Sequence, residues 1–166
     1  MRLWILSVGL LLVVGIVGCV RQSPVRQSRE EEVATEINRL GGSFSHASGG
    51  VAGPIVEVYF NGTHLTDVGL EHLKGLNNLR QLHLGSTQVT DAGLEHLKGL
   101  TKLSMLWLSH TQITDGGLEH LSGMTNLRHL FVDGTQVTDE GVKKLEETLP
   151  ECGVTTKIQG GIFQRG

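Results

Sequence analysis

The sequence predicts an α/β solenoid in which short strand–helix units stack on one another. A segment recurs at a spacing of 24 residues: TDVGLEHLKGL begins at Thr66, TDAGLEHLKGL at Thr90, TDGGLEHLSGM at Thr114 and TDEGVKKLEET at Thr138. Leu and Val recur at the same period, and one strand with one short helix cannot bury its apolar faces alone. Stacking consecutive units buries these faces, so the repetition specifies a stack rather than a reaction.

Residues 1–18 have the layout of a secretory signal peptide. Arg2 gives a positive start, an apolar run extends from Leu3 to Val17, and small residues precede Cys19. The ending IVGC resembles the bacterial lipobox, in which the cysteine becomes the lipidated first residue of the mature chain. We therefore expect an exported, membrane-anchored protein of the cell envelope with lipid on Cys19. An uncleaved anchor and plain secretion are the alternatives.

The segment that precedes the repeats divides into a tether and a cap. Residues 19–32 are polar and show no apolar period, so we expect a tether. Within residues 33–54, Val33, Ile37 and Leu40 follow the spacing of one helical face, two glycines stop the helix, and SFSH is a candidate strand. This segment should cap one open end of the stack.

Residues 55–158 contain the repeats, and the unit around Leu82 shows their parts. The stretch LRQLHL alternates, with Leu82 and Leu84 on one face, as expected of a half-buried strand. Thr90 and Asp91 are residue types that cap helix N-termini. The short helix that follows has leucines on its inner face, and a glycine that recurs inside each helix indicates close packing there. The last helix is longer and more polar, as an exposed end of the stack requires.

The pattern LxxLxLxxTxVTDxGLxxLxxL resembles the leucine-rich repeat, in particular the VTDxGL variety of planctomycete-type bacterial proteins. The resemblance implies a short leucine-rich-repeat solenoid with parallel strands on its concave face, short helices on its convex face and a cap at both ends. Residues 159–166 lie beyond the pattern as a C-terminal tail. Threonine replaces the usual Asn or Cys of the ladder position, where its hydroxyl can still bind loop backbone groups, at Thr63, Thr87, Thr111 and Thr135.

Composition and motifs argue against several other functions. A net charge of −3 provides no basic field for nucleic acid. The sequence lacks G-x-S-x-G, P-loop, H-E-x-x-H and C-x-x-C motifs, so we expect neither catalysis nor a cofactor. His72, His96 and His120 recur in three helices, but packed helices lie about 8–10 Å apart, so we interpret them as a solvated face and not a zinc site. Cys152 is expected to be a buried small hydrophobe.

The strand residues that face away from the core should line the concave surface in columns. The middle column is aromatic or imidazole in every strand, and strands lie about 4.7–4.9 Å apart, so its rings should form a continuous, solvent-exposed stripe. We expect this stripe to bind a partner, with Trp107 as the main anchor. The alternative is that the rings only stack and shield the sheet. The candidate binding residues are Tyr59, Gln81, His83, Met105, Trp107, His129, Phe131 and Asp133.

These patterns together predict a function in binding. We expect a monomeric, membrane-tethered leucine-rich-repeat module that holds an unknown protein or peptide on its concave face. The alternative is a structural envelope lipoprotein that has no specific ligand. Five strands or fewer would make the face shallow, and we expect His83 to lie near Glu57 and Asp133.

Overall fold

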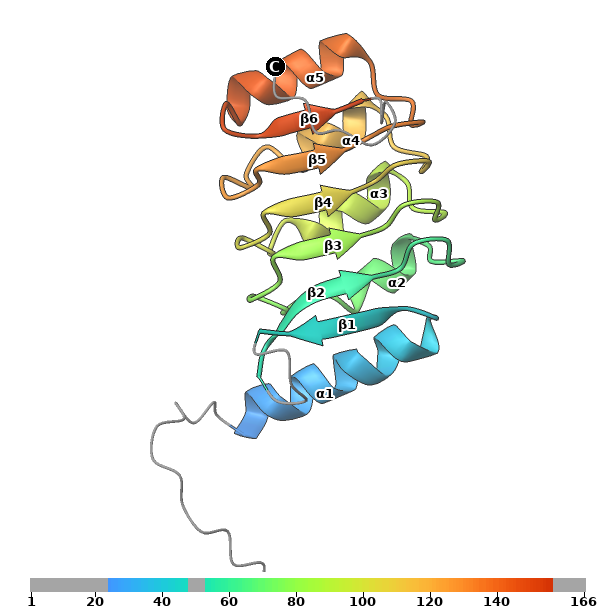
Figure 1. Cartoon of the computed structure of the whole chain (residues 1–166), viewed down its shortest axis with the longest axis vertical. Helices are drawn as coiled ribbons and strands as arrows, with labels where there is room; N and C mark the ends of the chain where they lie inside the picture. The colour runs from blue at the N-terminus through green and yellow to red at the C-terminus, as the bar shows by residue number, and fades with distance from the viewer. Residues whose placement is uncertain (1–23, 48–52, 157–166) are drawn as a thin grey trace, which may run out of the picture.

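The structure is a computed structural model that describes residues 24–47 and 53–156. Strands lie along one side of the molecule and short helices along the other, and the units follow one another in a single stack (Figure 1). The sheet has six strands in sequence order, one more than the sequence suggested. The α/β solenoid with parallel strands and short helices is therefore confirmed.

The strands are short, and all but one run parallel. The first pair is antiparallel and joins β1 (Ser43–His46) to β2 (Ile55–Tyr59). The remaining strands add in parallel: β3 (Gln81–His83), β4 (Met105–Trp107), β5 (His129–Phe131) and β6 (Gly153–Thr155). The helices are α1 (Pro24–Arg39), α2 (Asp67–Glu71), α3 (Asp91–Leu94) with the 3₁₀ turn η1 (Glu95–Leu97), α4 (Asp115–Glu119) and α5 (Asp139–Thr148).

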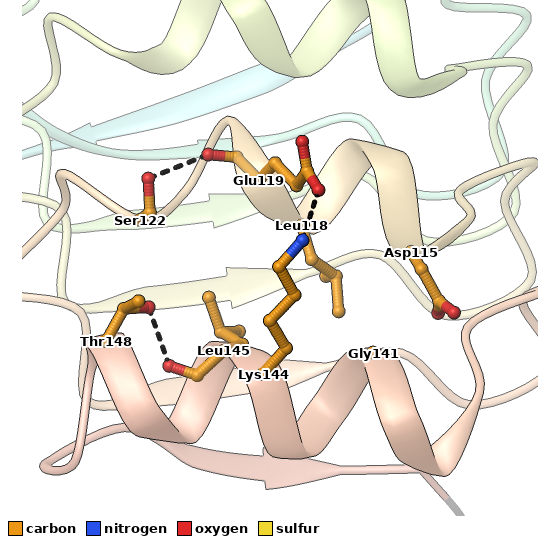
Figure 2. Close-up of a pocket in the computed structure, with 8 residues that line it drawn as sticks. All are labelled: Asp115, Leu118, Glu119, Ser122, Gly141, Lys144, Leu145 and Thr148. Carbon is orange, nitrogen blue, oxygen red and sulfur yellow. Dashed lines mark hydrogen bonds and ion pairs between the residues drawn. The ribbon is translucent and has the colours of Figure 1, made fainter.

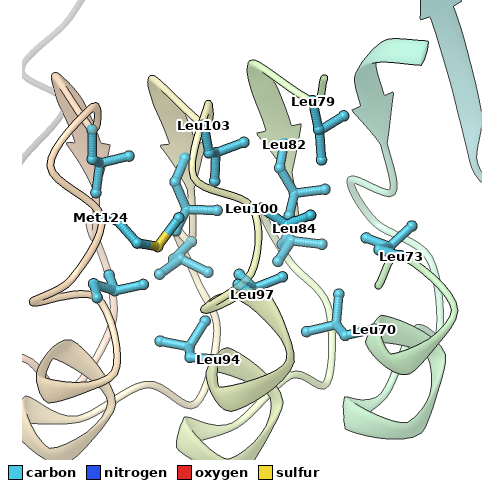
Figure 3. Packing of buried hydrophobic residues seen from close by; sticks show 14 of the residues in the cluster. Leu70, Leu73, Leu79, Leu82, Leu84, Leu94, Leu97, Leu100, Leu103 and Met124 are labelled. Carbon is cyan, nitrogen blue, oxygen red and sulfur yellow. The ribbon is translucent and has the colours of Figure 1, made fainter. Parts of the chain in front are cut away.

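One continuous apolar core fills the space between strands and helices. Leucines at equivalent positions lie in rows that run from repeat to repeat, such as Leu70 with Leu94 (Figure 3). Met124 takes the place that Leu100 has in the preceding repeat, and both are buried. Burying one such side chain stabilises the fold by about 1.5–3 kcal/mol. Because each row needs a neighbour on both sides, the stack is stable only as a whole.

The threonines of the ladder position bind the loop backbone, as predicted. Each hydroxyl donates to the carbonyl oxygen three residues earlier, which closes the turn that follows the strand. The four hydrogen bonds are Thr63 to Phe60 (2.8 Å), Thr87 to Leu84 (2.6 Å), Thr111 to Leu108 (2.5 Å) and Thr135 to Val132 (2.6 Å). A small hydroxyl is thus sufficient in place of the longer Asn side chain.

Three aspartates each bind the threonine that precedes the helix of the next repeat. Asp91 accepts hydrogen bonds from the backbone N–H of Thr114 (2.8 Å) and from its hydroxyl (2.5 Å). The same two bonds join Asp67 to Thr90 and Asp115 to Thr138. The prediction that the Thr-Asp pair provides the N-cap is therefore confirmed for the threonine and not for the aspartate. The threonines occupy the N-cap positions, and the carboxylates bridge consecutive repeats.

The recurring helical glycine makes room for this aspartate. A Cβ atom added at Gly117 would collide with a carboxylate oxygen of Asp91, and a Cβ at Gly141 would collide with Asp115. Gly69 has no aspartate of an earlier repeat beside it, and its nearest side chain is that of Leu65. The close packing expected from the glycine column is confirmed, and its cause is the bridging carboxylate.

The N-terminal cap is longer than the sequence indicated. Helix α1 begins at Pro24, inside the segment expected to be a tether, because proline is favourable in the first turn of a helix and the residues after it are good helix formers. Val33 and Ile37 are buried in the core, and the helix packs against β1 at this end of the sheet (Figure 1). The expected strand at Ser43–His46 is also present. The proposed signal peptide, the first residues of the tether and the C-terminal tail lie outside the described residues.

The last unit differs from the repeats as expected, and it adds one strand that we did not predict. Helix α5 is ten residues long, whereas α2 and α4 each have five. After it, β6 pairs with β5 in the same register as the other parallel strands. Its segment lacks the leucines of the repeat, so the alternation alone gave no sign of a strand.

We expect Gly117→Ala to destabilise the protein when Asp91 is present and to have little effect when Asp91 is alanine. In the first case the methyl group displaces the carboxylate. In the second it adds the helix propensity of alanine, about 1 kcal/mol, and must fit only beside Ile113. Asp91→Ala alone should cost about 1–3 kcal/mol because it leaves a backbone N–H unpaired. Denaturant unfolding of both single variants and the double variant measures the coupling. If the two single substitutions changed the free energy of unfolding additively in the double variant, the proposed clash between the methyl group and the carboxylate would be contradicted.

Candidate functional site

Parallel pairing brings seven of the eight candidate binding residues, all except Asp133, together on one face of the sheet. From β2 to β5 each residue pairs with the residue at the equivalent position of the next repeat, so the columns expected from the sequence form. The first column contains Glu57, Gln81, Met105 and His129, and the middle column contains Tyr59, His83, Trp107 and Phe131. All of these except Phe131 are partly exposed.

The rings of the middle column form one continuous stack. The ring centroids of Tyr59 and His83 are 4.5 Å apart, those of His83 and Trp107 are 3.8 Å apart, and those of Trp107 and Phe131 are 5.0 Å apart. The planes of neighbouring rings are inclined by 24°, 9° and 5°. Rings this close and this parallel cover each other's faces. The stack therefore presents mainly ring edges on the concave side.

The stack is less exposed than the sequence suggested. The side chains of Tyr59, His83 and Trp107 are half-buried, and Phe131 is buried with 9% of its surface accessible. The expectation of four solvent-exposed rings is thus wrong for Phe131 and partly right for the others. Mutual stacking is the physical reason, since each ring removes one face of its neighbour from water. Part of the stack therefore shields the sheet, as the alternative interpretation held.

His83 is held neutral inside the stack. Its Nε2 atom is buried and has no hydrogen-bond partner among the described residues. Burial lowers the pKa of the imidazole below its ordinary value, and the nearby negative charge of Glu57 opposes this shift without reversing it. The neutral ring can lie flat between Tyr59 and Trp107 without the desolvation cost of a charge.

Glu57 lies beside the first ring and accepts two hydrogen bonds on one oxygen. The hydroxyls of Tyr59 and Ser45 each donate to its Oε2 atom over 2.7 Å. The hydrogen bond from Tyr59, then that from Ser45, lowers the pKa of the carboxyl below its usual range, so Glu57 stays charged. The same bond raises the pKa of the Tyr59 hydroxyl. Sequence reasoning placed Glu57 in its column but missed Ser45, because only the antiparallel pairing of β1 brings Ser45 alongside.

Asp133 lies apart from the ring stack, at the loop after β5. Its carboxylate is 3.6 Å from Nε2 of His110, and its backbone carbonyl accepts a hydrogen bond from the N–H of His110. The expectation that His83 lies near Glu57 and Asp133 is therefore wrong for Asp133, because the carboxylate that acts on His83 is that of Glu57. Ser109, in the same turn region, has a buried hydroxyl without a hydrogen-bond partner among the described residues.

The helix histidines and the cysteine occupy the places expected of them. Nε2 of His72 is 3.4 Å from a carboxylate oxygen of Glu36 on α1, so it contacts the cap. His96 and His120 are partly exposed on the convex side. Among the described residues, no group of three or more His, Cys, Asp or Glu side chains could hold a metal ion. Cys152 is buried, and burial raises the pKa of its thiol to about 11, so it is a packing residue as predicted.

A groove of about 380 Å³ lies on the convex side between α4 and α5. Leu118 and Leu145 line it, and both belong to the core (Figure 2). The amine of Lys144 extends from α5 to the carboxylate of Glu119 on α4 and forms an ion pair over 2.5 Å. We interpret the groove as the seam between the last two units, because its floor is packing surface and an ion pair joins its rims.

Comparison with known proteins agrees with this geometry. Residues 77–137, the central part of the stack, match the family described as leucine-rich repeat. The fold is a short leucine-rich-repeat solenoid. No curated protein sequence matches the chain. None of the helices within residues 24–47 and 53–156 is long and apolar enough to cross a membrane.

Several solved structures are similar to the chain. Actin-binding site 2 of leiomodin-1 is 16% identical and has a TM-score of 0.52, with 83% of this chain and 82% of that chain covered. An internalin of Listeria monocytogenes is 22% identical, has a TM-score of 0.39 and covers 54% of this chain and 32% of its own. A leucine-rich-repeat protein of Leptospira interrogans is 19% identical, has a TM-score of 0.38 and covers 51% of this chain and 27% of its own. The chain thus spans about a third or less of these two proteins, and the likeness to leiomodin-1 concerns the fold alone.

We expect stability to fall as the pH is lowered from about 6.5 towards 5 because of His83. Its pKa in the folded chain lies below the unfolded value, so the unfolded chain takes up a proton that the folded chain excludes. Stability is highest above the unfolded pKa, declines as the pH falls to the folded pKa, and levels off below it. His83→Gln cannot take up the proton and should lose this part of the pH dependence. Thermal unfolding of the wild type and of His83→Gln at the two pH values tests this prediction. An equal loss of stability in the two proteins on lowering the pH would contradict it.

Proposed function

We propose that this chain is an exported, membrane-tethered and non-catalytic module that holds a protein or peptide on its concave face. The observation that supports this proposal is the continuous stack of Tyr59, His83, Trp107 and Phe131. Only 4% of the residues are aromatic, and half-buried rings are concentrated on this one face. Solenoids commonly bind partners on such extended concave surfaces.

The column beside the rings gives this face the composition of an interface. Gln81 and His129 offer polar atoms, and Met105 offers a flexible apolar side chain that adapts to different partners. An apolar strip with a polar border is typical of protein–protein interfaces. Six short strands make a small surface, so we expect modest affinity for a short peptide or a flat protein patch.

The alternative function is that of a structural envelope lipoprotein without a specific ligand. The burial of Phe131 and the mutual covering of the ring faces favour this alternative, because rings that only shield the sheet would show the same geometry. In the proposed function the exposed ring edges contact a partner, whereas in the alternative they only shield the sheet. A substitution at the centre of the stack distinguishes the two functions.

Trp107→Ala should abolish the capture of a partner from envelope extract by the immobilised full-length chain. The substitution removes the largest ring edge from the face, and large aromatic side chains dominate interface energetics. Since Trp107 stacks on two rings, the variant should also lose some stability, so Trp107→Phe, which keeps a stacked ring, is included as a second variant. Val68→Ala, at an exposed apolar residue of the convex side, is the matched control. Equal capture by wild type, Trp107→Ala and Val68→Ala would contradict a concave binding site.

The membrane tether is proposed from the sequence of residues 1–19. The apolar run that ends in IVGC supports lipid attachment at Cys19 after cleavage, and the polar residues before α1 would separate the stack from the membrane surface. Because the stack would then face outward from the membrane, its concave face would be accessible to other envelope components.

Cys19→Ser should release the protein from the membrane fraction or leave an unprocessed precursor. A single acyl chain binds membranes marginally, whereas several chains give stable anchoring, so removal of the acceptor should have a large effect. Fractionation followed by intact-mass measurement provides the test, with Cys152→Ser as the matched control. A wild-type mass that corresponds to an intact Met1 end or to unmodified Cys19 would refute lipidation.

A further inference from the structure

The two ends of the ring stack differ, and at one of them no ring of the described residues covers the outer face of the last ring. Within the stack the ring faces cover each other, which excludes ligands that must lie flat on a ring, such as sugars and quaternary ammonium groups. At the far end Phe131 is buried. At the near end, Tyr59 is paired across β1 with Ser43, a small and exposed residue, so no ring covers its outer face from that strand.

A carboxylate with free acceptor capacity lies at the hydroxyl end of this ring. Oε2 of Glu57 accepts from Tyr59 and Ser45, whereas Oε1 has no hydrogen-bond partner among the described residues. Both hydroxyls are donors to Glu57, so they hold the carboxylate in place and leave its charge uncompensated. A planar cation can lie on the outer face of such a ring and donate at the same time to a fixed carboxylate at the hydroxyl end of the ring.

The described residues supply no cation at this position. None of the six described strands contains lysine or arginine, and Glu57 is their one acidic residue. Arg128, which precedes β5, donates to the carbonyls of Thr125 and Leu127 and is turned towards its own loop. Among the described residues, the one further side chain whose charge would act on Glu57 is His83, and burial keeps its ring neutral. The negative charge of this end is therefore available to a partner.

We propose that the Glu57–Tyr59 end of the concave face binds an arginine side chain of the partner peptide or protein segment. This inference rests on the proposed binding function of the same face. Arginine fits better than lysine, because its planar guanidinium can lie on the Tyr59 ring while its N–H groups donate to Glu57, whereas an ammonium is a compact, strongly hydrated charge. The Ser43 side chain is small enough to admit it.

The strand spacing determines how far the arginine lies from the Trp107 anchor. A guanidinium on the outer face of Tyr59 takes the place of a ring on β1, which is three strand positions from Trp107 on β4, or about 14–15 Å at the usual strand separation. An extended segment that crosses the strands rises about 3.1–3.4 Å per residue. The segment should therefore carry an arginine and an apolar residue with about three or four residues between them.

A display library of random peptides, selected against the full-length chain in detergent micelles, tests the inference. We expect the enriched peptides to contain arginine and an apolar residue at this separation. A synthetic enriched peptide should bind Glu57→Gln about tenfold more weakly than wild type, because glutamine keeps the acceptor for Ser45 and Tyr59 but removes the charge. Glu95→Gln, on the exposed convex side, is the matched control and should bind as wild type does. Replacing the arginine of the peptide by alanine should weaken binding to wild type and have little further effect with Glu57→Gln.

The outcomes separate this inference from the proposed function. Peptides that lack arginine and bind Glu57→Gln as tightly as wild type, yet lose binding with Trp107→Ala, would overturn the arginine site and leave the binding face intact. Peptides that bind Trp107→Ala and Glu57→Gln as tightly as they bind the wild type would overturn both the arginine site and the binding face. The absence of any enriched peptide would also overturn both.

Discussion

The contact between an aspartate of one repeat and a threonine of the next is the interaction on which the rest of the structure depends. The carboxylate of Asp91 accepts both the backbone N–H and the hydroxyl of Thr114, so it pairs a donor at the helix start that has no partner inside its own helix. Two bonds to one residue also define the position and orientation of the next unit. Glycine is needed opposite each bridging carboxylate, because any Cβ at Gly117 would occupy the same space.

The concave face follows from this constraint. When every unit repeats the position of the one before it, equivalent side chains lie beside one another at the strand spacing. A ring in each of four consecutive strands then has to stack, and the observed centroid distances of 3.8–5.0 Å lie close to that spacing. Stacking stabilises the sheet but takes the ring faces away from solvent. What remains for recognition is a line of ring edges with polar atoms beside it.

The two ends of the ring stack differ because different strands flank it at the two ends of the sheet. At one end the antiparallel strand β1 brings Ser45 to Glu57 and places small serines beside Tyr59, which leaves a charged and open margin. At the other end Phe131 is buried, and the strand that follows belongs to the last unit with its buried Cys152. The two ends of the concave face are therefore chemically different: one carries the charge of Glu57, and the other is apolar and buried. A partner would bind this face in one orientation.

The repeat period and the alternation along each strand determined the fold class, the core and the columns of the concave face. These features follow from local periodicity, since side chains alternate across a strand and the same positions recur in every unit. Leu82 and Trp107 were therefore assigned to opposite faces correctly. The close packing at the helical glycines and the loop contacts of the threonines were also evident from residue type and position alone.

Only the tertiary structure decided the rest, because it depends on which groups meet across units. Asp91 is suited equally to capping its own helix and to bridging to the next, and only the distance between units selects the bridge. The exposure of Phe131 depends on what lies next to it, and the pKa of His83 on the rings that exclude water from it. The contact of Ser45 with Glu57 needs an antiparallel strand from outside the repeat pattern. Periodicity specifies which residues share a face, whereas burial and charge are properties of the assembled stack.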